Sequence, residues 1–241
     1  MKMSYAGCSQ RGLVRSTNED AYLMRSSGHA ALFLVADGIG GRAHGGVVSA
    51  MLRDGYDAWF RRHILLPGEN LDFQAAVGGL RGVLLEQNKE VIRRFGPGTA
   101  GSTIVLLFIL GNRYLYFWSG DSRIYRGHRL SVKQITIDDV YENWTDRPAK
   151  WEPSKVGKLV GAVGICPVPK ITLGTGALCR GDRFFLCSDG VYRYLSDRDL
   201  RMRMRFSPKD PGQLIADLAG RVEGHGAGDN YSMIFARVDS V

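Results

Sequence analysis

Carboxylates recur in this sequence where short apolar runs end. Asp37 ends the run "ALFLVAD", and Asp189 ends "RFFLCSD" in the same way. Asp121 lies in "WSGDSR" after another apolar run, and Asp229 lies in "GAGDN", directly before the last one. Taken singly, each is an ordinary turn aspartate, because aspartate next to glycine favours turns. Their recurrence at predicted strand boundaries suggests a shared chemical role.

The residue types decide which chemistry such a cluster could perform. Glu19 and Asp20 add two adjacent carboxylates in "STNEDAY". Oxygen ligands without a neighbouring histidine or cysteine favour Mg²⁺ or Mn²⁺ over zinc. Gly38 and Gly190, which each follow an aspartate, would let the chain turn tightly and expose a carbonyl. Because converging carboxylates repel one another and divalent cations relieve that repulsion, we predict that Asp37 is presented to a metal ion.

The composition is that of an ordinary globular protein with a basic balance. The 241 residues are 44% hydrophobic and 23% charged, with a formal net charge of +8. That charge suits any anionic partner, including nucleic acids and phosphorylated proteins. No nucleic-acid-binding module is recognisable, so we predict no nucleic-acid partner. The arginines of "DRDLRMRMRF" fall on more than one helix face, which favours a solvated surface over a docking patch.

Two further features bear on the compartment. The apolar run "STIVLLFIL" has only nine residues, too few to cross a bilayer, and the N-terminus lacks the apolar stretch of a secretory signal. We therefore expect a cytoplasmic protein with no membrane insertion. The cysteines form no C-x-x-C pair and are predicted to be buried reduced thiols. They are Cys8, Cys166, Cys179 and Cys187.

The elements that must position the carboxylates follow from the apolar periodicity and the turn residues. Helices are predicted at residues 45–63, 72–95, 197–206 and 211–222. Strands are predicted at residues 5–12, 19–25, 30–37, 102–110, 113–120, 122–128, 170–175, 183–189 and 231–238. Residues 138–164 are polar and irregular, as in a loop beside a functional site. Hairpin-linked strands with two pairs of helices predict packed antiparallel sheets covered by helices, in a single domain of residues 1–241.

Six motifs, taken in order, resemble the signature of the metal-dependent protein phosphatases of type 2C in their compact bacterial form. They are "RSTNEDAY", "VADGIGG", "GSTIVLL", "GDSRIYR", "FLCSDGVYRYLSD" and "GDNYSMIFARV". Each is weak alone, but together, in this order, they span the chain from about Tyr5 to Val238. The resemblance implies an α+β fold, the αββα sandwich of two antiparallel sheets between helix pairs, with residues 138–164 as a flap near the active site.

The resemblance also implies a binuclear metal site that binds two Mn²⁺ or Mg²⁺ ions. Asp37 would bridge the two ions, and the carbonyl of Gly38 would ligate one of them. Asp189 and Asp229 would complete the other site. The implied reaction is a single-step hydrolysis of phosphoserine or phosphothreonine, in which a water activated by both metals attacks phosphorus.

Three more residues take roles by the same resemblance. Glu19 and Asp20 would act at the edge of the metal site, directly or through water. Arg15 matches the arginine that grips the substrate phosphate, for which a guanidinium is suited because it bonds two phosphate oxygens at once. In this interpretation Arg15 and Asp37 are the catalytic residues.

Two departures from the family pattern matter. Ile39 and Arg42 stand where the family often has histidine, and His44 is out of register. The group that protonates the leaving oxygen is therefore open, with a metal-bound water as the default, and we expect Arg42 to help hold phosphate. Arg193 stands where many bacterial members have an aspartate that holds a third metal together with Asp121. We predict that this third site is weak or empty.

The leading hypothesis is a serine/threonine phosphoprotein phosphatase acting on the substrates of a cognate kinase, for example one that controls a secretion or envelope system. The alternative is a catalytically weak phosphoprotein-binding regulator of the same fold, which the complete set of core ligands argues against. In the flap, Trp144 and Trp151 could contact substrate or anchor the loop to the core.

Overall fold

Ten strands in the described part of the chain form two antiparallel sheets of five strands each. The computed structural model describes residues 1–39, 44–66, 71–144 and 152–241. The first sheet has the order β1 (Lys2–Gln10), β10 (Tyr231–Ser240), β9 (Arg183–Cys187), β6 (Arg123–His128) and β7 (Ser131–Gln134). The second has the order β2 (Asp20–Ser26), β3 (Ala30–Asp37), β4 (Ile104–Leu110), β5 (Arg113–Ser119) and β8 (Thr172–Ala177).

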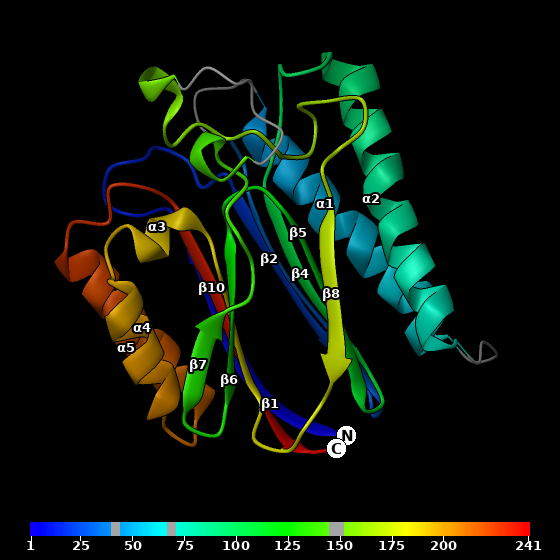
Figure 1. The fold of residues 1–241 in the computed structure, drawn as a ribbon, viewed down its shortest axis with the longest axis vertical. Coiled ribbons are helices and arrows are strands. Elements are labelled where there is room, and N and C mark those ends of the chain that lie inside the picture. Colours follow the sequence, from blue (N-terminus) through cyan, green and yellow to red (C-terminus); the bar gives the residue numbers. More distant parts are fainter. Residues whose placement is uncertain (40–43, 67–70, 145–151) are drawn as a thin grey trace.

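Helices cover the outer face of each sheet (Figure 1). They are α1 (Gly45–Phe60), which continues as the π-turn η1 (Arg61–Leu65), then α2 (Phe73–Phe95), α3 (Asp189–Tyr192), α4 (Asp197–Arg205) and α5 (Pro211–Gly224). Two 3-10 turns, η2 (Tyr141–Asn143) and η3 (Pro153–Lys155), lie in the flap. Helix α1 packs against β2 and β3, and α5 packs against β1 and β10. This arrangement confirms the predicted αββα sandwich.

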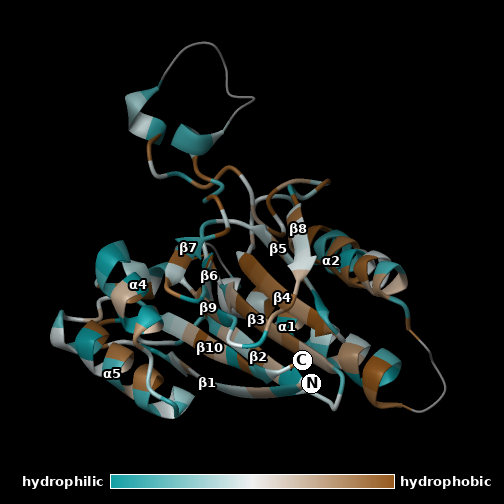
Figure 2. Ribbon diagram, turned by 60° about the horizontal axis from the view of Figure 1, so that its bottom comes forward, coloured by the Kyte–Doolittle hydropathy of each residue, from teal (hydrophilic) through white to brown (hydrophobic). Residues whose placement is uncertain are grey.

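Strand β3 shows why the sandwich needs continuous apolar runs. Leu32 and Leu34 point into the core between the second sheet and α1 and α2, whereas Phe33 and Val35 point into the core between the two sheets. Because side chains alternate along a strand, a strand covered on both faces must be apolar at every position. Figure 2 shows the same concentration of hydrophobic residues on the central strands. The polar exception is Asp37, at the end of the strand.

Side-chain caps begin α2, α4 and α5. Asp72 caps α2, since its Oδ1 accepts hydrogen bonds from the backbone N–H groups of Gln74 and Ala75 at 2.7 and 2.8 Å. Ser196 and Asp210 cap α4 and α5 in the same way. Strand β7 and helix α3, with four residues each, were not predicted. No helix within the described ranges combines the length and apolarity that a bilayer crossing requires.

The prediction of four buried thiols is wrong for two of them. Cys187 is buried in β9 and Cys8 is half-buried, but Cys166 and Cys179 are exposed, and all four are free. Cys179 lies in the turn between β8 and β9, and Cys166 lies in the loop before β8. Apolar sequence neighbours did not imply burial, because both positions lie in connecting segments at the surface.

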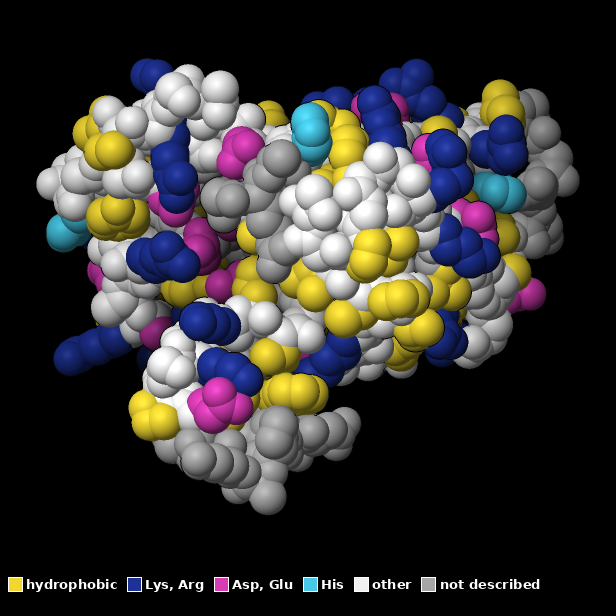
Figure 3. All heavy atoms as spheres, turned by 90° about the horizontal axis from the view of Figure 1, so that it is seen from above, with side chains coloured by type: hydrophobic (Ala, Val, Ile, Leu, Met, Phe, Trp, Pro, Cys, Tyr) yellow, Lys and Arg dark blue, Asp and Glu magenta, His cyan; other side chains and the backbone are white. Residues whose placement is uncertain are grey.

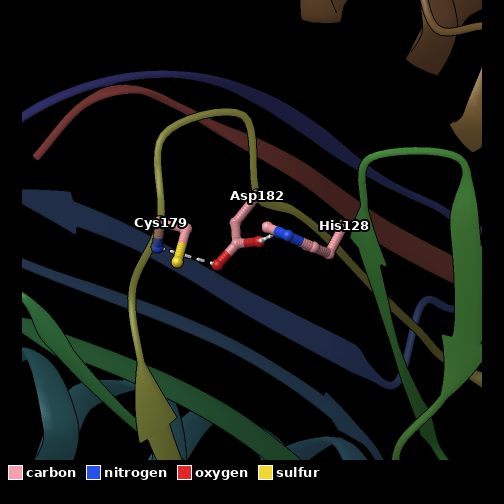
Figure 4. A group of neighbouring side chains, drawn as sticks. All are labelled: His128, Cys179 and Asp182. Atoms are coloured by element: carbon pink, nitrogen blue, oxygen red, sulfur yellow. Dashed lines mark hydrogen bonds and ion pairs between the residues drawn. The ribbon is translucent and has the colours of Figure 1, made fainter.

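Three side chains of metal-binding type meet at the turn that carries Cys179 (Figure 4). The carboxylate of Asp182 lies 2.7 Å from Nδ1 of His128, and it accepts hydrogen bonds from Arg126 and from the backbone N–H of Cys179, both at 3.0 Å. Asp182 is fully buried, and both of its oxygens have partners. We interpret the group as an anchor that ties the β8–β9 turn to the end of β6.

Candidate active site

The strand ends bring the predicted carboxylates together at one edge of the sandwich. Asp37 ends β3, and Asp20, which begins β2, is its direct partner in the antiparallel register. Asp189 follows β9 and is the first residue of α3, while Asp121 lies between β5 and β6. Asp229 lies just before β10. Because the two sheets pack face to face, these ends from both sheets reach the same cleft.

The cleft has a volume of about 490 Å³ and combines acidic, basic and apolar walls. Its charged lining residues are Arg15, Glu19, Asp37, Asp121, Lys158, Asp189, Arg193 and Asp229. Its other lining residues are Gly38, Ile39, Thr103, Gly157, Leu159, Ile165 and Asn230. Seen from above, acidic side chains lie in a hollow with Lys and Arg side chains around it (Figure 3).

The glycines after Asp37 and Asp189 lie where the backbone is crowded. Neither Gly38 nor Gly190 has a positive φ, so a left-handed backbone conformation is not what requires glycine there. A Cβ on Gly38 would lie 2.7 Å from the carbonyl oxygen of Glu19, and one on Gly190 would collide with the Asn230 carbonyl. These positions need glycine because two backbone segments approach closely there.

Hydroxyl and amide side chains hold the acidic segments in place. The Thr103 hydroxyl accepts a hydrogen bond from the Asp37 N–H at 3.1 Å, and the Ser102 hydroxyl donates one to the Asp37 carbonyl at 2.9 Å. The Ser188 hydroxyl donates to Oδ2 of Asp20 at 2.8 Å. Asn230 holds the loop before β2 in place, since its Oδ1 accepts a hydrogen bond from the Glu19 N–H at 2.9 Å.

Several carboxyl groups of the cleft are so crowded and buried that their pKa values lie above the ordinary range. Burial, followed by the charges of Asp20, Asp189 and Asp121, raises the pKa of Asp37 well above its ordinary value. Burial raises the pKa of Asp20 to about 7 and that of Asp121 to about 6. Burial also raises the pKa of Asp189, although the charge of Arg193 opposes the rise. Such a cluster stores electrostatic repulsion that a bound cation would relieve.

The donor set fits divalent metal ions. Oδ1 of Asp20 is buried and has no hydrogen-bond partner among the described residues, so a carboxylate oxygen is left with its acceptor capacity unused. No histidine or cysteine is among the described residues that line the cleft, and the ligands on offer are carboxylate and carbonyl oxygens. This chemistry suits Mg²⁺ or Mn²⁺.

Two arginines add positive charge beside these carboxylates. Nε of Arg15 lies 2.8 Å from Oδ1 of Asp229, and Nη2 donates to Oδ2 at 2.9 Å, which makes a two-pronged pair. Nη2 of Arg193 lies 2.6 Å from Oδ2 of Asp189, and its Nη1 lies 3.8 Å from Asp229. Arg193 therefore places a positive charge beside Asp189, and this charge also acts on Asp121.

Two of the remaining candidates are described, and neither lines the cleft. Arg42 and Trp151 fall outside the described residues. His44 stacks on Phe95, with ring centroids 4.8 Å apart, and does not line the cleft. Trp144 packs edge-on against Tyr141 at 6.5 Å between centroids, which favours its role as a loop anchor.

Several residues of the site were not singled out from the sequence. Thr103, Ser188 and Asn230 lie within the motifs "GSTIVLL", "FLCSDGVYRYLSD" and "GDNYSMIFARV", so their motif context was a usable signal. Lys158 lies in the polar flap and had none. Their contribution depends on contacts between segments far apart in the chain, such as the bond between Ser188 and Asp20.

Comparison with known proteins identifies the family. A sequence profile described as Protein phosphatase 2C matches residues 10–209, and this chain belongs to that family. The serine/threonine protein phosphatase PstP of Mycobacterium tuberculosis is 29% identical over 246 residues, covering 98% of this chain and 45% of PstP. The chain thus spans less than half the length of that relative.

Solved structures share the fold over nearly the whole chain. PppA, described as a key regulatory component of T6SS in Pseudomonas aeruginosa, superimposes with a TM-score of 0.82 at 31% identity, covering 98% of each chain. The catalytic domain of PstP in complex with two manganese ions has a TM-score of 0.76 at 25% identity, covering 98% of this chain and 99% of the domain. The predicted family membership is confirmed.

Proposed function

We propose that this chain is a metal-dependent phosphatase that hydrolyses phosphoserine and phosphothreonine in proteins, with residues 1–241 acting as one catalytic domain. The observation that carries the proposal is the convergence of Asp37, Asp189 and Asp229, from distant parts of the sequence, on one cleft that also contains Arg15. Membership of the protein phosphatase 2C family and the manganese-bound relative support it.

The proposed metal ligands are the acidic groups of the cleft. Asp37, Asp189 and Asp229, together with the Gly38 carbonyl, would hold two Mn²⁺ or Mg²⁺ ions, with Glu19 and Asp20 at the edge. When bound, these ions supply Lewis acidity and a water that is activated near neutral pH. Ser102 and Thr103 keep the backbone of Asp37 in position, which fixes the carboxylate between the two sheets.

Arg15 would bind and orient the substrate phosphate. Its guanidinium already presents two N–H donors to the two oxygens of Asp229, and a phosphate group offers a pair of oxygens with similar geometry. Arg193 adds a second positive charge on the cleft wall. Since no histidine is among the described lining residues, the proton for the leaving oxygen would come from water in the cleft.

The proposed partners are phosphorylated proteins modified by a cognate serine/threonine kinase in the cytoplasm. The names of the relatives, all serine/threonine or protein phosphatases, support the substrate class. The description of PppA as a key regulatory component of T6SS is compatible with the expected role in a secretion system.

Hydrolysis of p-nitrophenyl phosphate and of a phosphothreonine peptide tests the proposal. We expect turnover with Mn²⁺, none with a chelator, and none in Asp37→Ala. Asp54→Asn, which changes an exposed carboxylate on α1, should keep full activity. Arg15→Ala should lose about 10- to 100-fold in kcat/KM, because a hydrogen bond to a charged group contributes about 1.5–3 kcal/mol. Wild-type protein without metal-dependent turnover, or a fully active Asp37→Ala, would refute the proposal and favour a binding role.

A further inference from the structure

The flap wall of the cleft carries a lysine whose charge is not balanced locally. Lys158 lines the cleft between Gly157 and Leu159, and its side chain is exposed. Among the described residues, its ammonium group has no ion-pair or hydrogen-bond partner. An exposed lysine without a partner costs the folded protein little free energy, but this one lies beside the proposed site of reaction.

Neighbouring lysines differ from Lys158 in this respect. Nζ of Lys155 lies 2.9 Å from Oε1 of Glu152, within the flap. Nζ of Lys170 lies 2.7 Å from the buried carboxylate of Asp139. The charges of Lys155 and Lys170 are therefore balanced by carboxylates of the protein. Among the described lysines of the flap, Lys158 is the one whose charge is available to a ligand.

The backbone around Lys158 is fixed on both sides. Its N–H donates to the Lys155 carbonyl at 2.9 Å, and its carbonyl accepts from the Tyr141 N–H at 2.9 Å. Leu159 forms a bridge with Val140 on the other arm of the flap. The side chain therefore starts from a defined point on the cleft wall, and a ligand that uses it need not order this part of the flap.

The charge balance of the cleft explains what Lys158 would attract. Three cationic and five carboxylate side chains line the cleft, so its floor is acidic. The charged side chains of the lining have a net charge of −2, which two divalent ions would change to +2, and a substrate phosphate would then occupy the floor. A phosphoresidue held there leaves its sequence neighbours at the mouth of the cleft, within reach of a long lysine side chain.

We propose that Lys158 selects substrate segments that carry a second anionic group, a carboxylate or another phosphate, within a few residues of the phosphoserine or phosphothreonine. The proposal rests on the proposed phosphatase function and specifies its substrate class. Lys158 is a specificity residue here and takes no part in the chemical step.

A set of matched phosphothreonine peptides tests the proposal with the full chain and Mn²⁺. The residues flanking the phosphothreonine are alanine, glutamate, a second phosphoserine, or lysine. Wild type should show a kcat/KM about three- to fivefold higher for the glutamate-flanked or doubly phosphorylated peptide than for the alanine-flanked one, as expected for one exposed ion pair. The two anionic peptides distinguish a carboxylate from a phosphate as the preferred group. Raising the salt concentration should shrink the preference.

Variants in the flap separate Lys158 from general charge effects. Lys158→Gln should remove the preference, and Lys158→Glu should reverse it toward the lysine-flanked peptide. Lys155→Gln, the control in the same segment of the flap, should keep it. The readout is the ratio of kcat/KM between the anionic and the alanine-flanked peptides within each variant. Hydrolysis of p-nitrophenyl phosphate, which has no flanking residues, normalises the activity of each variant.

The outcomes distinguish this proposal from the proposed function. If wild type hydrolyses p-nitrophenyl phosphate but shows no preference, or if the preference survives in Lys158→Gln, the role of Lys158 is refuted while the phosphatase stands. If wild type hydrolyses neither substrate, the phosphatase proposal fails. Binding of phosphonate analogues of the same peptides, measured by fluorescence anisotropy, then still decides whether Lys158 selects anionic neighbours.

Discussion

Replacing Asp37 by asparagine should stabilise the metal-free protein while abolishing its response to metal. Asp37 lies directly opposite Asp20 in the β2–β3 register, and the charges of Asp20 and Asp189 both help to raise its pKa. Like charges opposite each other on exposed strands cost up to about 1 kcal/mol, and charges 4 Å apart cost about 4 kcal/mol at an effective dielectric constant of 20. The site lies between these limits, so we expect Asp37→Asn to add about 2 kcal/mol to the free energy of unfolding in EDTA.

The pH dependence gives this prediction a sign that can be checked. Because the folded-state pKa of Asp20 is raised to about 7 and that of Asp37 is raised well above 3.8, the folded protein binds protons more tightly than the unfolded chain. Wild-type stability in EDTA should therefore fall as the pH rises from about 4 through 7. The advantage of Asp37→Asn should be largest at pH 8 and shrink toward pH 4.

Thermal unfolding in EDTA and in Mn²⁺ is the assay. A gain of about 2 kcal/mol should raise the Tm of a chain of this size by roughly 4–8 °C. Mn²⁺ at 100 times its Kd should stabilise wild type by about 2.7 kcal/mol and Asp37→Asn by far less. Asp54→Asn should behave as wild type in both conditions. The reasoning is refuted if Asp37→Asn is less stable than wild type in EDTA at pH 8 and is still stabilised by Mn²⁺.

Three further predictions concern the third metal, the β8–β9 turn and the thiols. Calorimetry should count two tightly bound Mn²⁺ ions per chain, because Arg193 stands in place of the aspartate that would hold a third ion together with Asp121; a third tight ion that disappears in Asp121→Ala would contradict this. Asp182→Asn should lower the free energy of unfolding in urea by about 3 kcal/mol, since it leaves the Arg126 charge without its buried partner, and a loss below about 1 kcal/mol would mean that the turn needs no such anchor. A thiol reagent should modify two cysteines quickly in the native protein, Cys166 and Cys179, and the others slowly, because Cys187 is buried and burial raises the pKa of Cys8 to about 11; four fast thiols would contradict the structure.

The sandwich could be predicted from the sequence because its signals are local. Strand β3 is apolar at every position until Asp37, and α2 begins directly after a capping aspartate, Asp72, so both patterns fix an element without knowledge of its neighbours. The short elements β7 and α3 have too few residues to show a period, and they form because neighbouring strands and loops hold them.

The acidic residues of the site could be predicted from the sequence, but their contacts with one another could not. The position of Asp37 at a strand end could be foreseen, but its pairing with Asp20 depends on strand register. The requirement for glycine at position 190 depends on the close approach of the Asn230 carbonyl, 40 residues later in the chain. Ser188 matters because it bonds to Asp20, and Lys158 matters because it lines the cleft without an ion-pair partner among the described residues. Only the folded chain reveals either fact.

The proposed metal site can be tested by a crystal structure of the protein with Mn²⁺, with anomalous diffraction recorded near the manganese edge. We expect two anomalous peaks in the cleft, with the Asp37 carboxylate between them and Asp189 and Asp229 bound to one of the two ions. A map with no manganese within bonding distance of these three carboxylates would contradict this expectation.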